Sequence, residues 1–200
     1  MAGLGIEDEA FIRGKVPMTK QEIRVLTMVK ARISPTDVVF DVGAGTGSMS
    51  VEAALLADKG HVYAVERNAE GVSLIEKNRE KFGVGNLTVV AGEAPAALKN
   101  LPDCDAAIVG GSGGSLSEIL DEIAVRLKAG GRVVINCITI QTLAAALDYF
   151  RGHESEFSYE AIQVQINRLQ TVGDYDMAKA INPIYIVTGE KKKTLFNRKI

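Results

Sequence analysis

Histidine and cysteine are scarce in this chain of 200 residues, with two of each. A structural metal site needs about four such ligands at short spacing. His61, His153, Cys104 and Cys137 do not provide that spacing, so we expect no bound metal. Both cysteines stand beside apolar runs, which predicts small core residues in a reducing compartment.

The chain also lacks a long apolar run. No segment reaches about 18 uninterrupted apolar residues, the length that spans a membrane. The N-terminal segment MAGLGIEDEAFIRG is acidic and has no apolar stretch of the kind found in signal peptides. We therefore expect a cytoplasmic protein that has no contact with membranes.

An excess of charge of one sign is missing as well. The formal net charge is −2, so the molecule as a whole is not expected to attract nucleic acid. Basic residues do gather near the C-terminus, and we interpret them as a solvated tail. They are Lys191, Lys192, Lys193, Arg198 and Lys199.

The residues that are present indicate one domain with one core, since 46% are hydrophobic and 24% are charged. Strand and helix signals alternate from residue 20 to about 150, which is typical of an α/β fold with a parallel sheet and helices on its faces. Within this domain we distinguish an N-terminal segment with the first helix (1–36), the main part (37–190) and the basic tail (191–200). Strands are expected at 38–42, 61–66, 87–91, 105–110 and 132–138. Helices are expected at 20–32, 47–57, 69–82, from Ser115 or Ser117 to about 128, and at 140–150. A short helical run is expected at 94–99.

The pattern changes after residue 150. Residues 158–170 alternate between apolar and polar, and residues 184–188 form a second strand-like run. Because no helix is needed between these runs, we expect them to pair as a hairpin. At the other end of the chain, Thr19 and Glu22 have the spacing of a capping box for the first helix.

The most informative segment is residues 38–54, VVFDVGAGTGSMSVEAA. A strand-forming run ends at Asp41, three glycines follow at alternate positions, and a helix-compatible stretch begins. Glycines let a ligand approach the backbone, and the helix N-terminus offers free N–H groups. A dinucleotide fingerprint would need glycine where Ser48 stands, which argues against a nicotinamide oxidoreductase. The pattern D-x-G-x-G-x-G resembles motif I of the S-adenosylmethionine-dependent methyltransferases.

Ligands of such sheets bind at the carboxyl ends of the strands, so the residues that follow each strand are the candidates. Asp41 is expected to hold the methionine ammonium group, directly or through water. Glu66 ends the second strand and suits the two ribose hydroxyls, because a carboxylate has two acceptor oxygens. The segment expected to pass under the methionine and the ribose consists of Gly43, Ala44, Gly45, Thr46 and Gly47.

After the third strand, the resemblance implies that the Glu93 carboxylate meets the adenine amino group and that the Ala94 N–H meets the ring. Alternatively, Glu93 only favours the start of the short helix through the helix dipole. The fourth strand is followed by a glycine loop instead of the Asn/Asp-Pro-Pro-Tyr motif of amine methyltransferases. That loop favours a large flat substrate lying against bare backbone, and it consists of Gly110, Gly111, Ser112, Gly113 and Gly114.

Four stretches together give a closer resemblance. The chain reads VPMTKQEIR from Val16, DVGAGTG from Asp41, GGSGG from Gly110 and NPIY from Asn182. Over residues 5–190 it is similar to the CbiT family, the decarboxylating methyltransferases of cobalamin biosynthesis. The resemblance implies a Rossmann-like, seven-stranded class I methyltransferase sheet, mostly parallel, with the last strand inserted antiparallel and helices on both faces.

The resemblance also implies the chemistry. The cofactor is S-adenosylmethionine, and the substrate is precorrin-6B or its cobalt form, a tetrapyrrole. The enzyme methylates carbon-15 and removes the carboxyl group of the acetate arm at carbon-12. Family members are homotetramers, and methylation at carbon-5 would need a separate partner chain.

A substrate with many carboxylates needs cations near its site. The candidates are Arg13, Lys15, Lys20 and Arg168, each of which is alternatively a solvated surface charge. The family's Pro-x-Thr-Lys segment folds over the cofactor, so Thr19 is expected to touch S-adenosylmethionine as well as to cap its helix.

Two other functions stay open. A tRNA methyltransferase would share the fold, but the chain lacks a basic surface and aromatic platforms for bases. A non-catalytic binding subunit would keep the fold too, although intact Asp41, Glu66 and glycines argue against a decayed site.

Overall fold

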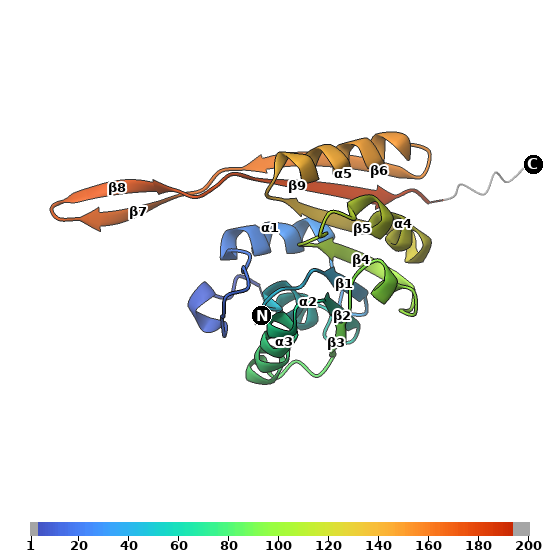
Figure 1. The fold of residues 1–200 in the computed structure, drawn as a ribbon, viewed down its shortest axis with the longest axis horizontal. Coiled ribbons are helices and arrows are strands. Elements are labelled where there is room, and N and C mark those ends of the chain that lie inside the picture. The colour runs from blue at the N-terminus through green and yellow to red at the C-terminus, as the bar shows by residue number, and fades with distance from the viewer. Residues whose placement is uncertain (1–3, 194–200) are drawn as a thin grey trace, which may run out of the picture.

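The computed structural model describes residues 4–193. Its main sheet has seven strands, which are β1 (Val38–Val42), β2 (His61–Glu66), β3 (Leu87–Ala91), β4 (Cys104–Val109), β5 (Leu127–Cys137), β6 (Phe157–Val164) and β9 (Ile184–Lys191). They lie in the order β3-β2-β1-β4-β5-β9-β6 (Figure 1). Neighbours among β1 to β5 are parallel, and β9 runs antiparallel to both β5 and β6. The predicted α/β sheet with an inserted antiparallel strand is confirmed.

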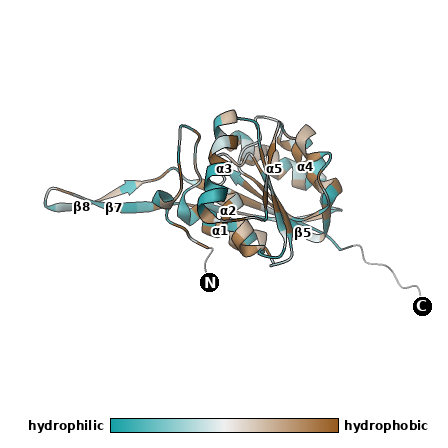
Figure 2. Cartoon of the chain, turned by 90° about the horizontal axis from the view of Figure 1, so that it is seen from below, coloured by the Kyte–Doolittle hydropathy of each residue, from teal (hydrophilic) through white to brown (hydrophobic). Residues whose placement is uncertain are grey.

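Helices cover both faces of this sheet. They are η1 (Asp8–Ala10), α1 (Gln21–Ala31), α2 (Ser48–Leu56), α3 (Ala69–Phe82), η2 (Ala96–Leu98), α4 (Leu116–Arg126) and α5 (Ile140–Gly152). Helices α4 and α5 pack on one face, and α1, α2 and α3 pack on the other. Both faces are therefore buried, and the central strands are largely hydrophobic in Figure 2.

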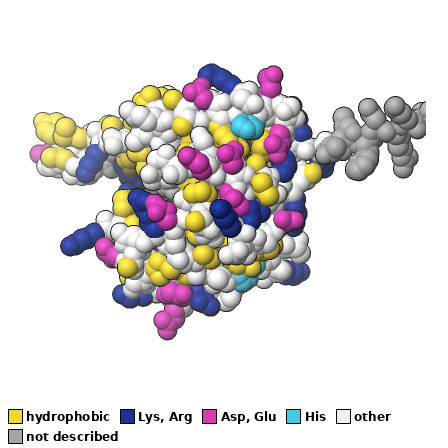
Figure 3. All heavy atoms as spheres, turned by 45° about the vertical axis from the view of Figure 1, so that its right-hand side comes forward, with side chains coloured by type: hydrophobic (Ala, Val, Ile, Leu, Met, Phe, Trp, Pro, Cys, Tyr) yellow, Lys and Arg dark blue, Asp and Glu magenta, His cyan; other side chains and the backbone are white. Residues whose placement is uncertain are grey.

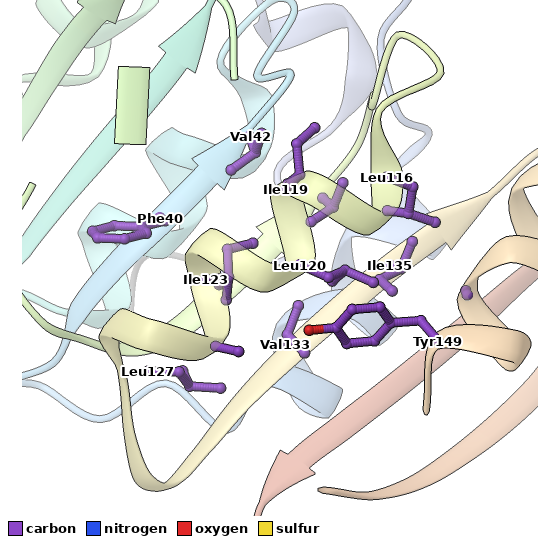
Figure 4. Close-up of a cluster of buried hydrophobic side chains, with 14 of the residues drawn as sticks. Phe40, Val42, Leu116, Ile119, Leu120, Ile123, Leu127, Val133, Ile135 and Tyr149 are labelled. Atoms are coloured by element: carbon purple, nitrogen blue, oxygen red, sulfur yellow. The ribbon is translucent and has the colours of Figure 1, made fainter. Parts of the chain in front are cut away.

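The period of two along each strand divides the core between the two faces. Phe40 and Val42 of β1 pack with α4 and α5, whereas Val39 between them packs with α2. Figure 4 shows the first of these clusters, in which Phe40 and Val42 of β1 lie beside α4, near its residues Ile123 and Ile119. Each parallel strand is thus fixed in register by two apolar layers.

Both cysteines belong to this core, as predicted. Cys104 and Cys137 are fully buried and free. Burial raises the pKa of the Cys104 thiol to about 12 and that of the Cys137 thiol to about 11, so neither is a ready nucleophile. In the part of the chain that the structure describes, no group of three or more His, Cys, Asp or Glu could hold a metal. No helix within residues 4–193 is long and apolar enough to cross a bilayer.

The prediction for the α4–β5 junction is wrong by several residues. The helix ends at Arg126, and Leu127 already pairs with Cys104 of β4. Lys128 is held there too, because its Nζ lies 2.8 Å from Asp105 Oδ2. The register of the β4–β5 pairing shifts between Cys104 and Ala106, and Gly130 has a positive φ of 84°. Both features accommodate the extra residues of β5 before regular pairing resumes.

The alternating run at 158–170 is not one strand. It divides into β6 and β7 (Asn167–Val172), and β7 pairs with β8 (Tyr175–Ala180), a strand that the sequence did not predict. We call residues 167–180 the arm, because they project as a two-stranded ribbon from the body (Figure 1). At its base Ile181 N donates to Ile166 O at 2.9 Å. The expected pairing of the two flanking runs is confirmed, since β6 and β9 are antiparallel neighbours.

The predicted capping box at the first helix is not formed. The N-cap of α1 is Lys20, and no side chain at that position caps the helix. Asp8 replaces Thr19 in this role, since its Oδ1 accepts a hydrogen bond from Gln21 N at 3.0 Å. The carbonyl of Thr19 accepts instead from Arg24 Nη1 at 2.6 Å. The start of α1 is therefore fixed by the preceding segment.

Candidate active site

A cavity of about 310 Å³ lies where β1 and β4 stand side by side. From β1 the chain builds strands β2 and β3 toward one edge of the sheet, and from β4 it builds strands toward the other edge. Open α/β sheets bind ligands at the point where the strand order reverses in this way. Five segments form most of its wall, namely 16–20, 42–46, 65–67, 92–94 and 110–113.

The structure brings most of the predicted site residues to this cavity. Its wall contains Thr19, Lys20, Gly43, Ala44, Gly45, Thr46, Glu66, Glu93, Ala94, Gly110, Gly111, Ser112 and Gly113. The residues outside it are Arg13, Asp41, Gly47, Gly114 and Arg168. Gly47 is the N-cap of α2, and a Cβ there would lie 3.0 Å from Ile75, so this glycine serves the packing of α2 against α3.

Glu66 is the best-organised polar group of the cavity. Its residue is 8% exposed, and each carboxylate oxygen accepts one backbone N–H, from Gly45 at 2.8 Å and from Asn68 at 2.7 Å. A carboxylate has about four acceptor positions, so each oxygen retains room for a ligand donor. The side chain is thus rigid and still able to accept two hydroxyl groups.

Gly71, in the first turn of α3, makes this arrangement sterically possible. A Cβ at Gly71 would lie 2.7 Å from Glu66 Cγ and 3.0 Å from Gly45 O. Sequence reasoning missed this residue. Its signal was a glycine inside a predicted helix, which normally destabilises the helix and therefore needs a packing reason.

The glycine segment after β1 touches the glycine loop after β4. Gly43 has φ 71°, and a Cβ there would lie 2.5 Å from Gly111 O and 2.7 Å from Gly111 N. Gly110 N also donates to Val42 O at 2.9 Å, which joins the ends of the two strands. Only glycine at position 43 allows this contact, which forms the floor of the cavity.

We expect Gly43→Ala to lower the free energy of unfolding by about 2 kcal/mol more than Gly83→Ala, measured by urea unfolding. Gly83 is the matched control, because it has a similar φ of 64° but nothing within 4 Å of an added Cβ. The comparison separates the steric clash with Gly111 from backbone strain. Equal losses in the two variants would contradict this account of the cavity floor.

Two buried oxygens near the cavity have no hydrogen-bond partner among the described residues, Thr46 Oγ1 and Asp41 Oδ1. Thr46 lines the cavity and is 1% exposed, so a polar ligand atom would satisfy its hydroxyl. Asp41 lies beneath the wall, where its other oxygen accepts from Ser50 Oγ at 2.5 Å. The expected ammonium contact of Asp41 therefore stays a prediction, and a direct contact would need the wall above it to open.

Burial raises the pKa of the Asp41 carboxyl to about 6. Because this exceeds its value in an unfolded chain, Asp41 contributes stability at low pH that is lost as the pH rises through about 6. We expect the free energy of unfolding contributed by Asp41 to fall by about 1 kcal/mol between pH 5 and pH 7.

Urea unfolding at both pH values tests this expectation in the wild type and in Asp41→Asn, which should lose that part of the pH dependence. The exposed residue Asp58 provides the control variant Asp58→Asn, which should behave as the wild type. An unchanged pH dependence in Asp41→Asn would show that another group is responsible.

Glu93 lies at the rim rather than inside the cavity. Its side chain is 65% exposed and pairs with Arg67, which follows β2, at 2.5 Å. Arg67 itself lines the cavity and was not predicted. A ligand amino group would have to compete with this guanidinium for the carboxylate, so the adenine role of Glu93 stays a prediction.

The segment before α1 is fastened over the cavity by buried polar side chains. Asn78 of α3 is fully buried, donates to Thr46 O at 2.9 Å and to Ile12 O at 3.0 Å, and accepts from Ile12 N at 2.8 Å. Arg24 of α1 is also fully buried and holds Thr19 O at 2.6 Å. These bonds place Val16 to Lys20 on the wall.

The proposed cations are not gathered at the cavity. Arg13 is exposed, and of the other candidates only Lys20 lies on the wall. Arg168, on the arm, donates from Nη2 to both oxygens of Glu22 at 2.8 Å, and this pairing lowers the pKa of the Glu22 carboxyl. Contact of Arg13 or Arg168 with a substrate stays a prediction.

A second cavity, of about 230 Å³, adjoins the first and shares part of its wall. The glycine loop forms one side, including Gly114, and the β5–α5 connection forms the other. Asn136 and Ile138 belong to both cavities and were not predicted, although Asn136 carries the signal that identified Glu66, a polar residue at the carboxyl end of a buried strand.

Known proteins resemble this chain over almost its full length. Residues 9–191 match the family described as precorrin methyltransferase domain. The probable cobalt-precorrin-6B C(15)-methyltransferase (decarboxylating) of Sulfolobus acidocaldarius is 43% identical, over 94% of this chain and 98% of that protein. The cobalt-precorrin-6B C(15)-methyltransferase (decarboxylating) of Salmonella typhimurium is 36% identical, over 94% and 97%.

Solved structures agree with this similarity. The crystal structure of precorrin-6y C5,15-methyltransferase from Geobacter metallireducens superposes with a TM-score of 0.88 at 38% identity, covering 94% of this chain and 98% of that one. The matched region includes the sheet, both cavities and the arm. This chain belongs to the precorrin methyltransferase domain family, as its resemblance to the CbiT family predicted.

Proposed function

We propose that this chain is a decarboxylating cobalt-precorrin-6B C15-methyltransferase that uses S-adenosylmethionine. The observation that carries the proposal is the pair of adjoining cavities at the β1/β4 switch point, one with a ribose-type acidic site and one against bare glycine backbone. Membership in the precorrin methyltransferase domain family supports the same reading.

The residues of the first cavity fit S-adenosylmethionine, which supplies an electrophilic methyl group when bound. Glu66 would accept hydrogen bonds from the ribose hydroxyls with the acceptor positions that Gly45 and Asn68 leave free. The Thr46 hydroxyl, which has no partner among the described residues, would form a hydrogen bond with a polar group of the ligand. Val16 and Met49 contribute apolar parts of the wall.

The chemistry needs orientation more than it needs a strong acid or base. The conjugated tetrapyrrole gives an electron pair to the methyl group, and the pair released when carbon dioxide leaves the acetate arm replaces it. The protein must hold carbon-15 of the substrate, which receives the methyl group, in line with that group at about 3–3.5 Å. The contact of Gly43 with Gly111 suits this task, because the wall between the two cavities is bare backbone there.

The test is to incubate the chain with S-adenosylmethionine and cobalt-precorrin-6B and to measure product mass. The expected product gains one methyl group and loses carbon dioxide. A parallel reaction with metal-free precorrin-6B shows whether the enzyme needs cobalt in the ring. No mass change while S-adenosylmethionine binds would refute the substrate, and no binding would refute the methyltransferase itself.

We also propose that the chain assembles as a homotetramer through the arm, whereas a separate C5-methyltransferase partner stays a prediction. A two-stranded ribbon alone is marginally stable, and every residue of β7 and β8 is exposed in the single chain. Its exposed apolar side chains are Leu169, Val172, Tyr175 and Met177. Figure 3 shows hydrophobic side chains gathered on this projection, at the left of the view. Such a surface is typical of one that another chain covers.

Replacing two of these side chains should weaken assembly. Tyr175 and Met177 lie on one face of the arm, because each is two residues from the other on β8. We expect Tyr175→Ser with Met177→Ser to raise the dissociation constant of the oligomer about tenfold or more, measured by sedimentation. The control is Val125→Ser on α4, because Val125 is as exposed as Tyr175. An unchanged sedimenting mass at all concentrations would exclude the arm as the interface.

A further inference from the structure

Asn136 occupies an unusual position at the end of β5. It is 6% exposed, and it lines both the first and the second cavity. Its neighbour Ile135 points to the α4 side of the sheet, so Asn136 points to the α1 side, where the reaction partners would meet. A buried amide at the border of two cavities needs partners for its hydrogen-bonding groups.

One end of this amide is fixed by the protein and the other is left available. Thr27 of α1 is fully buried, and its single hydroxyl hydrogen is shared between two acceptors, Ile23 O at 2.7 Å and Asn136 Oδ1 at 3.1 Å. The nitrogen Nδ2 carries two hydrogens, and its acceptor among residues 4–193 is the Met49 sulfur at 3.5 Å, which is a weak one. A strong donor is therefore held in place without a strong acceptor.

The substrate of the function proposed above supplies such an acceptor, because it bears carboxylates. Methyl transfer requires carbon-15 to face the first cavity, which would place the adjoining part of the ring at the second cavity. The acetate arm that is lost belongs to the neighbouring pyrrole ring, so a donor at the border lies within its reach. Hydrogen bonds to ionised groups are about twice as strong as neutral ones, which favours a carboxylate over a carbonyl.

We propose, resting on that function, that the Asn136 amide donates a hydrogen bond to the carboxylate of the acetate arm and holds the arm in the orientation from which carbon dioxide leaves. Thr27 acts through Asn136 as a positioning residue, because it fixes the plane of the amide. The bond does not contribute to binding of the methyl donor. Asn136 thus couples decarboxylation to methyl transfer.

The test uses Asn136→Asp and Asn136→Leu, which keep the size of the side chain but replace the donor by an anion or by an apolar group. Three quantities are measured on cobalt-precorrin-6B: methyl transfer, release of carbon dioxide, and the dissociation constant of S-adenosylmethionine without substrate. We expect carbon dioxide release to fall about 10- to 100-fold, methyl transfer to fall less, and the dissociation constant to stay within about threefold.

Two further variants sharpen the interpretation. Thr27→Val should lower the ratio of carbon dioxide release to methyl transfer by a smaller factor. Thr88→Val, at an exposed position of β3, should leave that ratio unchanged. Urea unfolding shows whether each protein is folded. Should the Asn136→Asp variant not fold, Asn136→Leu gives the same readout.

The outcomes are distinct. A wild type that binds S-adenosylmethionine but does not act on the tetrapyrrole overturns the proposed function and this role with it. An active wild type whose Asn136 variants keep the ratio of decarboxylation to methylation overturns this role alone. A loss of S-adenosylmethionine affinity as large as the loss of rate would place Asn136 in the donor site instead.

Discussion

Arg24→Met is expected to lower the free energy of unfolding by about 3–5 kcal/mol, because it leaves buried Glu52 without its cation and removes the nearest cation of buried Asp8. Arg24 is fully buried, and it lies 3.0 Å from Glu52 and 2.7 Å from Asp8. It also donates to the carbonyls of Thr19 and Ile6. Burial raises the pKa of the Glu52 carboxyl even in the presence of Arg24, which shows how unfavourable the site is for an uncompensated charge.

Urea unfolding measures this loss, and two further variants make it specific. Arg24→Met combined with Glu52→Gln should recover part of the stability, because the second change removes the uncompensated charge. Arg79→Met should have little effect, since Arg79 is 40% exposed and pairs with Glu76 at the surface. If Arg79→Met were as harmful as Arg24→Met, the buried cluster would not be the cause.

Glu66→Gln is expected to raise the dissociation constant of S-adenosylmethionine about 100-fold, measured by calorimetry. The change replaces one acceptor oxygen by an NH₂ group, which would face the N–H of Gly45 or of Asn68. It therefore removes the negative charge that the ribose hydroxyls would meet, and it also loosens the glycine segment. Both effects reduce affinity.

The control for Glu66 is Glu80→Gln, an exposed acid on α3, which should leave the affinity unchanged. Thermal or urea unfolding of Glu66→Gln establishes that the protein remains folded. A folded Glu66→Gln variant with the affinity of the wild type would remove the ribose role of this residue. It would also leave the first cavity without its main polar anchor.

The sequence predicted the half of the fold that builds the cavity. The bounds of β1, β2 and β3 agree with the predicted ranges, because each strand is a short apolar run between turn residues. Glu66 followed from the same pattern, as the acid that ends a buried strand. Asn136 has a similar position, one residue before β5 ends at Cys137, but the predicted strand extended to residue 138 and concealed that a polar side chain lies so close to its end.

The arm and the Arg24 cluster could not be predicted from the sequence, and the reasons are physical. The arm has no apolar alternation directed at a core, because its residues face no core of their own chain. The Arg24 cluster joins residues 16 and 28 positions apart, and no local periodicity connects them. Ion pairs of this kind follow from how η1, α1 and α2 pack, so they become visible only when the elements are placed.

The arm leaves and rejoins the sheet at one point, where Ile166 and Ile181 are hydrogen-bonded to each other. Residues inserted or deleted beyond that point do not alter the pairing of β6 with β9. If subunits associate through the arm as proposed, insertions and deletions here can change that association while the β6–β9 pairing of the sheet stays intact.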